Sequence, residues 1–230
     1  WKIYANDTKG NQNSSSVTFL VDSTNPTMNF VSPTETSGTY KTANSINVNV
    51  TATDTNLDKI VIRLFNSTFS QIRTNLSSTS PFNITYSSLA DGIYYFNSTV
   101  NDTANNQNST ETRNVTIDTT NPLIDYISST ENNNTNFSRT YIYVNVSITE
   151  TNFQNVTFTL FNTTGQVNVT TFTDSRREIN FTGLANGAYT YNVTTFDKAS
   201  RTNSTSTRLV RLDTANPTVN FVSPTETSPG

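Results

Sequence analysis

The phrase Asp-x-x-Asn-Pro occurs three times, and its spacing constrains the fold more than any other feature. The copies begin at Asp22, Asp118 and Asp213, which are 96 and 95 residues apart. After each copy, apolar residues alternate up to an aromatic residue, as at Met28 and Phe30. A boundary that recurs at a fixed interval indicates tandem modules, and this interval is close to the roughly 100 residues of one β-sandwich domain.

The same register continues between the boundaries. Leu64–Thr68 reads LFNST and Leu160–Thr164 reads LFNTT, again 96 residues apart. The polar stretch before Asp22 resembles the stretch that precedes Asp118. The predicted segments are residues 1–21, the last strands of a preceding module; 22–117 and 118–212, two complete Ig-like modules; and 213–230, the first strand of a following module.

Alternating apolar residues assign two faces to the predicted strands. Every second residue is apolar between Ile46 and Ala52, and the second module repeats this between Ile142 and Ile148. Such alternation buries one face of a strand and leaves the other in solvent. Turn residues separate these runs, and no apolar stripe has the helical period of 3.6 residues. The prediction is an all-β chain of tandem Ig-like β-sandwich domains, each of about 95 residues, joined like beads on a string.

Composition excludes several classes of function. The chain has neither cysteine nor histidine, which removes disulfides, thiol nucleophiles and the commonest general base and metal ligand. A net charge of −3 without a basic cluster argues against a nucleic-acid partner. No apolar run approaches the roughly 20 residues that cross a membrane. Since no phosphate loop, nucleophile elbow or metalloprotease motif is present either, we expect no enzyme and no membrane segment in this stretch.

Two phrases resemble the Ig-like tandem repeats of large bacterial and archaeal cell-surface proteins. The first is Leu-x-x-Gly-x-Tyr, from Leu89 to Tyr94, which in that family begins a late strand. The second, Ala-x-Asp-x-x-Gly-Asn, leads into the last strand; Asn6–Asn11 fits it, whereas Asp197–Arg201 keeps the aspartate and lacks Gly-Asn. The resemblance covers essentially the whole chain. It implies an Ig-like fold and a role as a stalk, adhesin, surface layer or fibre, because such repeats serve all of these.

Five residues are predicted to be structural. Tyr94 and Tyr189 lie near the start of the penultimate strand of each module, where a tyrosine corner binds its hydroxyl to nearby backbone. An ordinary core tyrosine is the alternative. Asp22, Asp118 and Asp213 open the boundary turn, in which proline ends the ladder and asparagine caps backbone groups.

Asparagine followed by Ser or Thr two residues later is the second dominant pattern. The chain has 34 Asn, and 19 of them begin a sequon, against about ten expected if Ser and Thr were placed at random. Strand alternation itself makes some sequons, because residues i and i+2 share a polar face. Equivalent positions in both modules favour selection instead: Asn49 and Asn145, Asn66 and Asn162, Asn97 and Asn192, Asn108 and Asn203.

We therefore predict heavy N-glycosylation, which would add solubility to a surface with only 13 % charged residues. The predicted acceptors are Asn6, Asn13, Asn49, Asn66, Asn75, Asn83, Asn97, Asn101, Asn108, Asn114, Asn133, Asn136, Asn145, Asn155, Asn162, Asn168, Asn180, Asn192 and Asn203.

Calcium is the one metal that the sequence leaves open. Asp54-x-Asn56-x-Asp58 has the alternating oxygen ligands of a calcium loop, but no glycine or distant glutamate completes an EF-hand, so an Asx turn is favoured. A calcium ion between modules is the other alternative to a simple turn. The residues that would hold it are Asp22, Asn25, Asp102, Asp118, Asn121 and Asp197.

The leading hypothesis is a structural segment of a heavily N-glycosylated extracellular filament, stalk or surface layer. Its partners would be copies of itself or further Ig-like modules, end to end or laterally. The low charge, the absence of cysteine and the many sequons fit an archaeal surface protein better than a bacterial one. The alternative is an adhesin repeat that binds carbohydrate or another cell surface, with Tyr141, Tyr143, Phe65 and Phe161 as exposed aromatic candidates.

Overall fold

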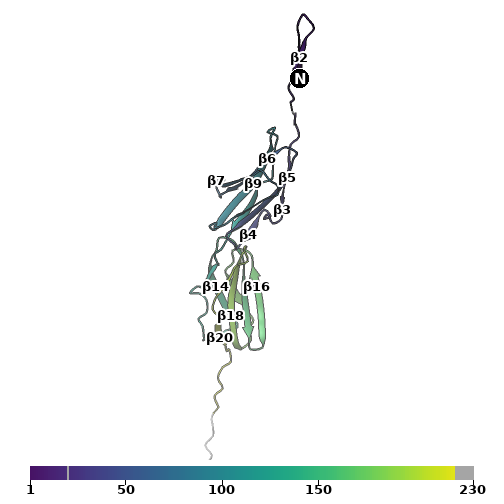
Figure 1. Ribbon diagram of the computed structural model, residues 1–230. Coiled ribbons are helices and arrows are strands. Elements are labelled where there is room, and N and C mark those ends of the chain that lie inside the picture. The colour runs from purple at the N-terminus through teal and green to yellow at the C-terminus, as the bar shows by residue number, and fades with distance from the viewer. Residues whose placement is uncertain (20, 221–230) are drawn as a thin grey trace, which may run out of the picture. The chain divides into compact units, whose positions relative to one another are not determined.

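The computed structural model describes residues 1–19 and 21–220. It separates into two compact units, Trp1–Thr119 (unit 1) and Thr120–Gly230 (unit 2), which Figure 1 traces in colour along the chain. All regular structure in the described residues is β-strand, so the all-β prediction is confirmed. Within those residues no helix has the length and hydropathy needed to cross a membrane.

Unit 1 contains two sheets and a separate hairpin. Its strands are β1 (Lys2–Asn6), β2 (Gln12–Ser16), β3 (Thr27–Val31), β4 (Thr39–Lys41), β5 (Ile46–Thr53), β6 (Leu57–Phe65), β7 (Gln71–Ser77), β8 (Phe82–Tyr86), β9 (Gly92–Asp102), β10 (Gln107–Ser109) and β11 (Arg113–Ile117). One sheet has the order β3-β5-β8, and the other has the order β4-β11-β9-β6-β7 with β10 paired to β9. The first strand region is divided: β3 pairs with β5 antiparallel, whereas β4 runs parallel to β11.

The core of unit 1 lies between the inner faces of these sheets. Ile46, Val48 and Val50 on β5 are fully buried, as the alternation predicts, and their neighbours Asn47 and Asn49 face outward. Phe96 on β9 is also fully buried and packs edge-on against Phe30 at 5.5 Å between ring centroids. The buried cluster is Met28, Ile46, Val48, Val50, Ala52, Ile60, Ile62, Leu64, Tyr86, Leu89, Tyr94, Phe96, Val100, Val115 and Ile117.

Unit 2 repeats the plan. Its strands are β12 (Leu123–Tyr126), β13 (Thr135–Phe137), β14 (Ile142–Thr149), β15 (Phe153–Asn162), β16 (Gly165–Phe172), β17 (Glu178–Phe181), β18 (Gly187–Asp197), β19 (Thr202–Ser204) and β20 (Arg208–Leu212). The sheet orders are β12-β14-β17 and β13-β20-β18-β15-β16, with β19 paired to β18. Tyr191 takes the central place that Phe96 has in unit 1, and its hydroxyl donates to the carbonyl oxygen of Glu131 at 2.7 Å.

The hairpin β1–β2 reproduces the end of a module. Asn6 pairs with Gln12, in the same register in which Asn101 pairs with Gln107 between β9 and β10. All residues of β1 and β2 are exposed. At the other end, residues 213–220 form no strand, and the remainder of the predicted following strand lies outside the described residues.

Candidate functional site: the module boundary and the sequon surface

Each unit places one tyrosine hydroxyl on the backbone just before its longest strand. The Tyr94 hydroxyl donates to the carbonyl oxygen of Ala90, and the Tyr189 hydroxyl donates to that of Ala185, both at 3.0 Å. Both rings lie in the buried clusters. This contact, four residues back along the chain, has the geometry of a tyrosine corner and closes the turn that leads into β9 or β18.

Two asparagines, Asn106 in the β9–β10 turn and Asn108 on β10, donate hydrogen bonds to the boundary phrase of unit 1. Asn106 Nδ2 donates to the carbonyl oxygen of Asp22 at 3.0 Å and to Asp102 Oδ2 at 2.8 Å. Asn108 Nδ2 donates to the carbonyl oxygen of Pro26 at 3.0 Å. Because buried oxygen atoms need donors, these bonds make the phrase an integral part of the module that follows it.

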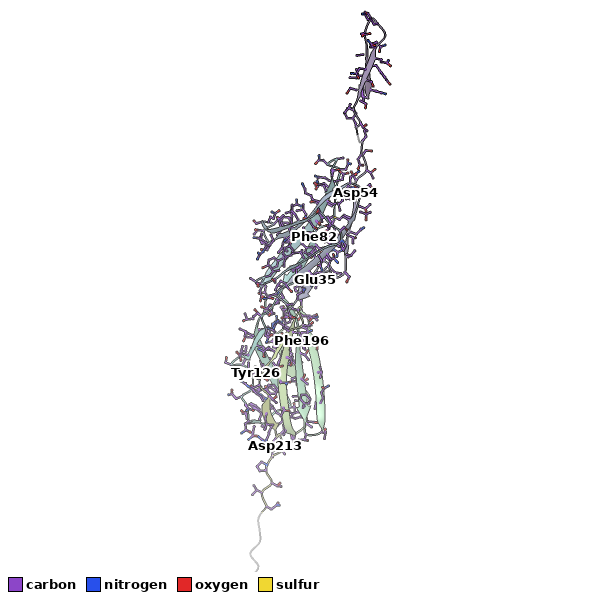
Figure 2. All side chains as sticks on the ribbon, in the orientation of Figure 1. Glu35, Asp54, Phe82, Tyr126, Phe196 and Asp213 are labelled. Atoms are coloured by element: carbon purple, nitrogen blue, oxygen red, sulfur yellow. The ribbon has the colours of Figure 1, made fainter. Side chains whose placement is uncertain are left out.

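Three carboxylates meet at this boundary. Asp22, Asp54 and Asp102 each bring one oxygen within 4.8 Å of the others, and we name them the boundary cluster. Asn56 supplies donors to two of them, its main-chain N to Asp54 Oδ1 at 2.7 Å and its Nδ2 to Asp22 Oδ2 at 2.8 Å. The bond from Asn56 is the main cause that lowers the pKa of Asp22. In Figure 2, Asp54 marks this end of the sandwich and Glu35 marks the opposite end.

The three carboxylates of the boundary cluster would supply part of the ligand set that a calcium ion needs. Calcium takes six to eight oxygen ligands at about 2.3–2.6 Å, and no Lys or Arg within the described residues forms a salt bridge with these three carboxylates. The sequence predicted Asp22 and Asp102 as ligands of an ion between modules. Asp54 joins them from the Asp54–Asp58 loop, for which the sequence favoured an Asx turn. Asn25 is exposed, and Asp58 accepts a hydrogen bond from Asn101 of β9.

Unit 2 has an arginine where unit 1 has Asn106. Arg201 Nη1 donates to Asn121 Oδ1 at 2.9 Å, and the main-chain N of Arg201 donates to Asp197 Oδ1 at 2.8 Å. Asp197 is fully buried, and its Oδ2 has no hydrogen-bond partner in the described structure. One oxygen of Asp197 lies within 4.8 Å of one oxygen of Glu150. The boundary of unit 2 therefore contains a fixed cation that unit 1 lacks.

The first residue of the boundary phrase also closes the module before it. The main-chain N of Asp118 donates to a carbonyl oxygen of β4 at 2.8 Å, and that of Asp213 donates to one of β13 at 2.9 Å. The threonine that follows each aspartate gives its N and Oγ1 to a single side-chain oxygen, Asp91 Oδ1 in unit 1 and Asn186 Oδ1 in unit 2. The recurrence of the phrase is explained by these hydrogen bonds, in which its main-chain and side-chain atoms take part.

The predicted glycan acceptors differ in accessibility. Attachment needs the amide nitrogen in solvent, and Asn101 is 6 % exposed with its Nδ2 donating to Asp58 Oδ2 at 3.1 Å, so the folded module hinders a sugar there. The exposed acceptors are Asn6, Asn13, Asn83, Asn108, Asn133, Asn136, Asn162, Asn168 and Asn180. The half-buried ones are Asn49, Asn66, Asn75, Asn97, Asn114, Asn145, Asn155, Asn192 and Asn203.

Two of the four paired sequons have a structural explanation. Asn203 Nδ2 donates to the carbonyl oxygen of the boundary proline of unit 2 at 3.0 Å, as Asn108 does in unit 1. Asn66 and Asn162 accept the main-chain N two residues ahead at 3.0 and 2.9 Å, which is an Asx turn opening each hairpin. The recurrence of these pairs follows from the fold, so it is not independent evidence for glycosylation.

The outer-face tyrosines of unit 2 are bonded within the protein. The Tyr143 hydroxyl donates to Glu178, which raises the pKa of Tyr143, and Asn145 Nδ2 donates to both residues at 3.2 and 3.1 Å. The guanidinium of Arg139 lies 4.5 Å from the ring centre of Tyr141, whose exposed fraction is 39 %. The Tyr143 hydroxyl and one face of the Tyr141 ring are thus occupied.

Sequence reasoning missed an aromatic pair on unit 1. Phe69, in the β6–β7 turn, stacks on Tyr95 of β9 with 4.1 Å between ring centroids and 22° between planes, and Phe69 is 60 % exposed. Its φ of 57° is in the left-handed region, which costs a bulky residue about 1–2 kcal/mol. The corresponding turn of unit 2 is one residue shorter and ends at Gly165. The difference in loop length between the two modules is the sequence feature that could have drawn attention to Phe69.

Comparisons with known proteins support the fold and leave the family open. No family model matches the chain, and no curated protein matches it. A marsupial T cell receptor structure matches with a TM-score of 0.52 and 10 % identity over 82 % of this chain and 73 % of that chain. A titin segment (TM-score 0.46, 12 % identity, 92 % and 74 % coverage) and a bacterial ice-binding adhesin (0.39, 12 %, 84 % and 67 %) match less well. The strand orders and the receptor match identify the chain as a tandem of Ig-like β-sandwiches.

Proposed function

We propose that this chain is part of an N-glycosylated extracellular surface protein built from Ig-like repeats, which forms a filament, stalk or layer. The observation that carries the proposal is the composition of the sheet edges. An edge strand exposes unpaired N–H and C=O groups, and soluble proteins usually protect such strands with charged side chains. In this chain, sequons occupy the charge-free edge strands other than β3.

At the ends of the sheet orders, the charge-free strands are β3, β8, β13 and β16. The hairpin strand β2 and the short strands β10 and β19, each paired on one side only, carry no charge either. Asn83 on β8, Asn136 on β13 and Asn168 on β16 each begin a sequon, and all three are exposed. The Thr170 hydroxyl donates to Asn168 Oδ1 at 2.8 Å, so the oxygen of that amide is engaged by its own sequon. Only β3, among the edges of the described sheets, has neither a charge nor a sequon. A sugar on these strands would block pairing between copies as lysine does elsewhere.

The array would be continued by further modules. In each unit the boundary phrase bonds to main chain and side chains of its module, and only this phrase separates the last strand of one module, β11, from the first strand of the next, β12. Stability in such arrays is a sum of module stabilities and neighbour terms. In this proposal the partners are further Ig-like modules or copies of the chain, and Asp22, Asp54 and Asp102 would hold a calcium ion that offsets their charge.

An adhesin repeat that binds carbohydrate is the second candidate. Tyr141 and Tyr143, its sequence-based candidates, contact Arg139, Glu178 and Asn145, which leaves little free polar surface beside them. The exposed Phe69 with Tyr95 is the observation that favours a sugar contact, and it lies on one module only. A ligand face repeated along the array is therefore disfavoured.

The proposal is tested on the native protein by site-resolved glycopeptide mass spectrometry and electron microscopy. We expect sugar at Asn83, Asn136 and Asn168, and filaments or layers of repeated modules. Replacing these three by Gln should cause additional, disordered aggregation through the uncovered strands, seen as light scattering above that of the native assembly. The matched control is Asn162→Gln, in a hairpin turn, which should leave the scattering at the native level. Unmodified sequons on a monomeric protein would contradict the proposal.

A further inference from the structure

The outer face of the long sheet of unit 1 carries an aromatic cluster that unit 2 lacks. Phe65 on β6 pairs directly with Tyr95 on β9, and Phe69 from the turn stacks on Tyr95; we name these three residues the Tyr95 face. Figure 1 shows β6, β7 and β9 within one sheet. In unit 2 the position of Tyr95 is taken by Thr190, and the residue corresponding to Phe69 is absent. The cluster is thus a feature of one module and not of the fold.

The backbone at Phe69 argues that the ring is retained for a purpose. Its φ of 57° is a conformation that glycine adopts easily and a bulky residue rarely does. The main-chain N of Phe69 donates to the carbonyl oxygen of Asn66 at 3.0 Å, so the tight turn fixes this conformation. Strain of this kind, at a residue that is 60 % exposed, is typical of a position kept for a contact.

A glycan acceptor lies beside the cluster on the same strand. Asn97 follows Tyr95 by two residues, and both point outward because Tyr94, Phe96 and Ser98 between and around them are buried. Asn97 Oδ1 is buried, and Asn97 Nδ2 donates to the hydroxyl of Thr112 at 3.2 Å in an exposed contact. The amide nitrogen therefore lies in an exposed contact, on the face of β9 that also carries Tyr95.

Polar donors border the same place. Arg63 on β6 pairs directly with Asn97, and its Nη1 donates to Thr99 Oγ1 at 3.0 Å, the hydroxyl of the Asn97 sequon. An exposed aromatic surface with a few fixed donors at its margin is the lining that sugar sites use. The apolar C–H face of a pyranose ring is attracted to the electron-rich face of an aromatic ring.

We propose that the first sugar of an N-glycan on Asn97 packs on the Phe69–Tyr95 pair, which makes the glycan a structural part of unit 1. This rests on the proposed glycosylation. Phe69 holds the ring of Tyr95 in place before the sugar arrives, and such preorganisation lowers the cost of ordering the contact. The glycan in turn covers apolar surface that would otherwise be wet.

Unit 2 supplies the matched control. Asn192 begins a sequon at the equivalent position of β18, with Thr190 in place of Tyr95. The two sites occupy equivalent strands, register and face, and they differ in the aromatic platform and in Thr159, which stands where unit 1 has Arg63. A sugar on Asn192 should therefore leave the stability of unit 2 nearly unchanged.

The test uses the full glycosylated chain. Glycopeptide mass spectrometry first establishes whether Asn97 and Asn192 carry sugar, and thermal unfolding with hydrogen exchange then assigns each transition to a unit. Asn97→Gln should lower the midpoint of unit 1 by a few degrees and increase exchange in residues 66–70. When Asn97→Gln is added to a protein that already carries Tyr95→Thr or Phe69→Gly, the midpoint of unit 1 should fall no further. Asn192→Gln should leave the midpoint of unit 2 unchanged. Phe69→Gly relieves the strained backbone and should therefore fold. It allows the effect of Asn97→Gln to be measured without the ring pair even if Tyr95→Thr folds poorly.

Three results would overturn the inference. An unmodified Asn97 removes its basis, and unmodified sequons on the edge strands as well would defeat the proposed function itself. An occupied Asn97 whose loss is equally costly with or without the rings refutes the stacking while glycosylation stands. Added oligosaccharide that quenches tyrosine fluorescence in Asn97→Gln, and equally in the glycosylated protein, would assign the rings to an outside sugar.

Discussion

At the boundary of unit 1, the neutral side chain of Asn106 lies beside carboxylates, whereas unit 2 places Arg201 at the same position. On the outer face, unit 1 has Tyr95 where unit 2 has Thr190. The tyrosine corners, sheet orders and paired strands are repeated in both. The contacts that build a module are therefore kept, and these differences lie at the boundary carboxylates and on the outer face of the long sheet.

The largest effect is expected in the shared core. Phe96 and Tyr191 occupy equivalent, fully buried positions, so replacing either by Ala should cost about 3–5 kcal/mol of unfolding free energy in its own unit. Urea unfolding, with hydrogen exchange to assign each transition, measures this. Thr207→Ala, at an exposed position, is the control and should change little. Equal losses in both units from one substitution would mean that the units do not unfold separately.

Calcium should separate the two boundaries. Millimolar calcium is expected to raise the unfolding midpoint of unit 1 by about 5 °C, because an ion that binds only the folded state stabilises it. Asp54→Asn keeps the Asx turn and removes one charge, and Asn106→Arg copies unit 2; both should abolish the shift. Calorimetry with and without a chelator measures it. An unchanged midpoint would contradict calcium binding. It would show that hydrogen bonds from amide donors alone stabilise the three carboxylates, and that the boundary cluster is a set of linked turns.

The tyrosine corners should respond alike. Tyr94→Phe and Tyr189→Phe each remove one hydroxyl-to-carbonyl bond of 3.0 Å, at an expected cost of about 1 kcal/mol in the respective unit. Denaturant midpoints provide the measurement. A difference above about 1 kcal/mol between the two would contradict the equivalence of the two modules at this contact.

Alkaline pH should affect unit 2 more than unit 1, with the smallest effects near neutrality. Burial raises the pKa of Tyr86 in unit 1 to about 12, and it raises the pKa values of Tyr126 and Tyr191 in unit 2. An unfolded tyrosine ionises near pH 10, so the stability is fully present below that pH and falls as the pH rises towards the folded values. Circular dichroism along an alkaline titration should show unit 2 failing first. Tyr126→Phe should bring the alkaline pH at which unit 2 unfolds closer to that of unit 1.

Much of the fold could be predicted because it depends on local alternation. Ile46, Val48 and Val50 are buried where a period of two places them, and Pro26 and Pro122 precede the first strands of the two modules, where a missing N–H does no harm. These features depend only on residues that are close together in the sequence. They require no knowledge of which distant segments meet.

The sites were harder to predict, because each depends on long-range contacts or on a single residue. Asp54 joins Asp22 and Asp102 only after two sheets have formed. Asn108 resembles any other sequon, although its amide nitrogen binds the boundary proline carbonyl. Phe69 lies in a turn whose extra residue no alternation reveals.

The parallel pairing of β4 with β11, and of β13 with β20, has a mechanical consequence. These pairs join the opening of each module to its closing strand. Tension applied to the two ends of a module pulls such strands past one another along their length, so the hydrogen bonds between them share the load instead of opening one after another. A chain built this way should resist stretching at each repeat with no covalent crosslink, although it has no cysteine to form a disulfide.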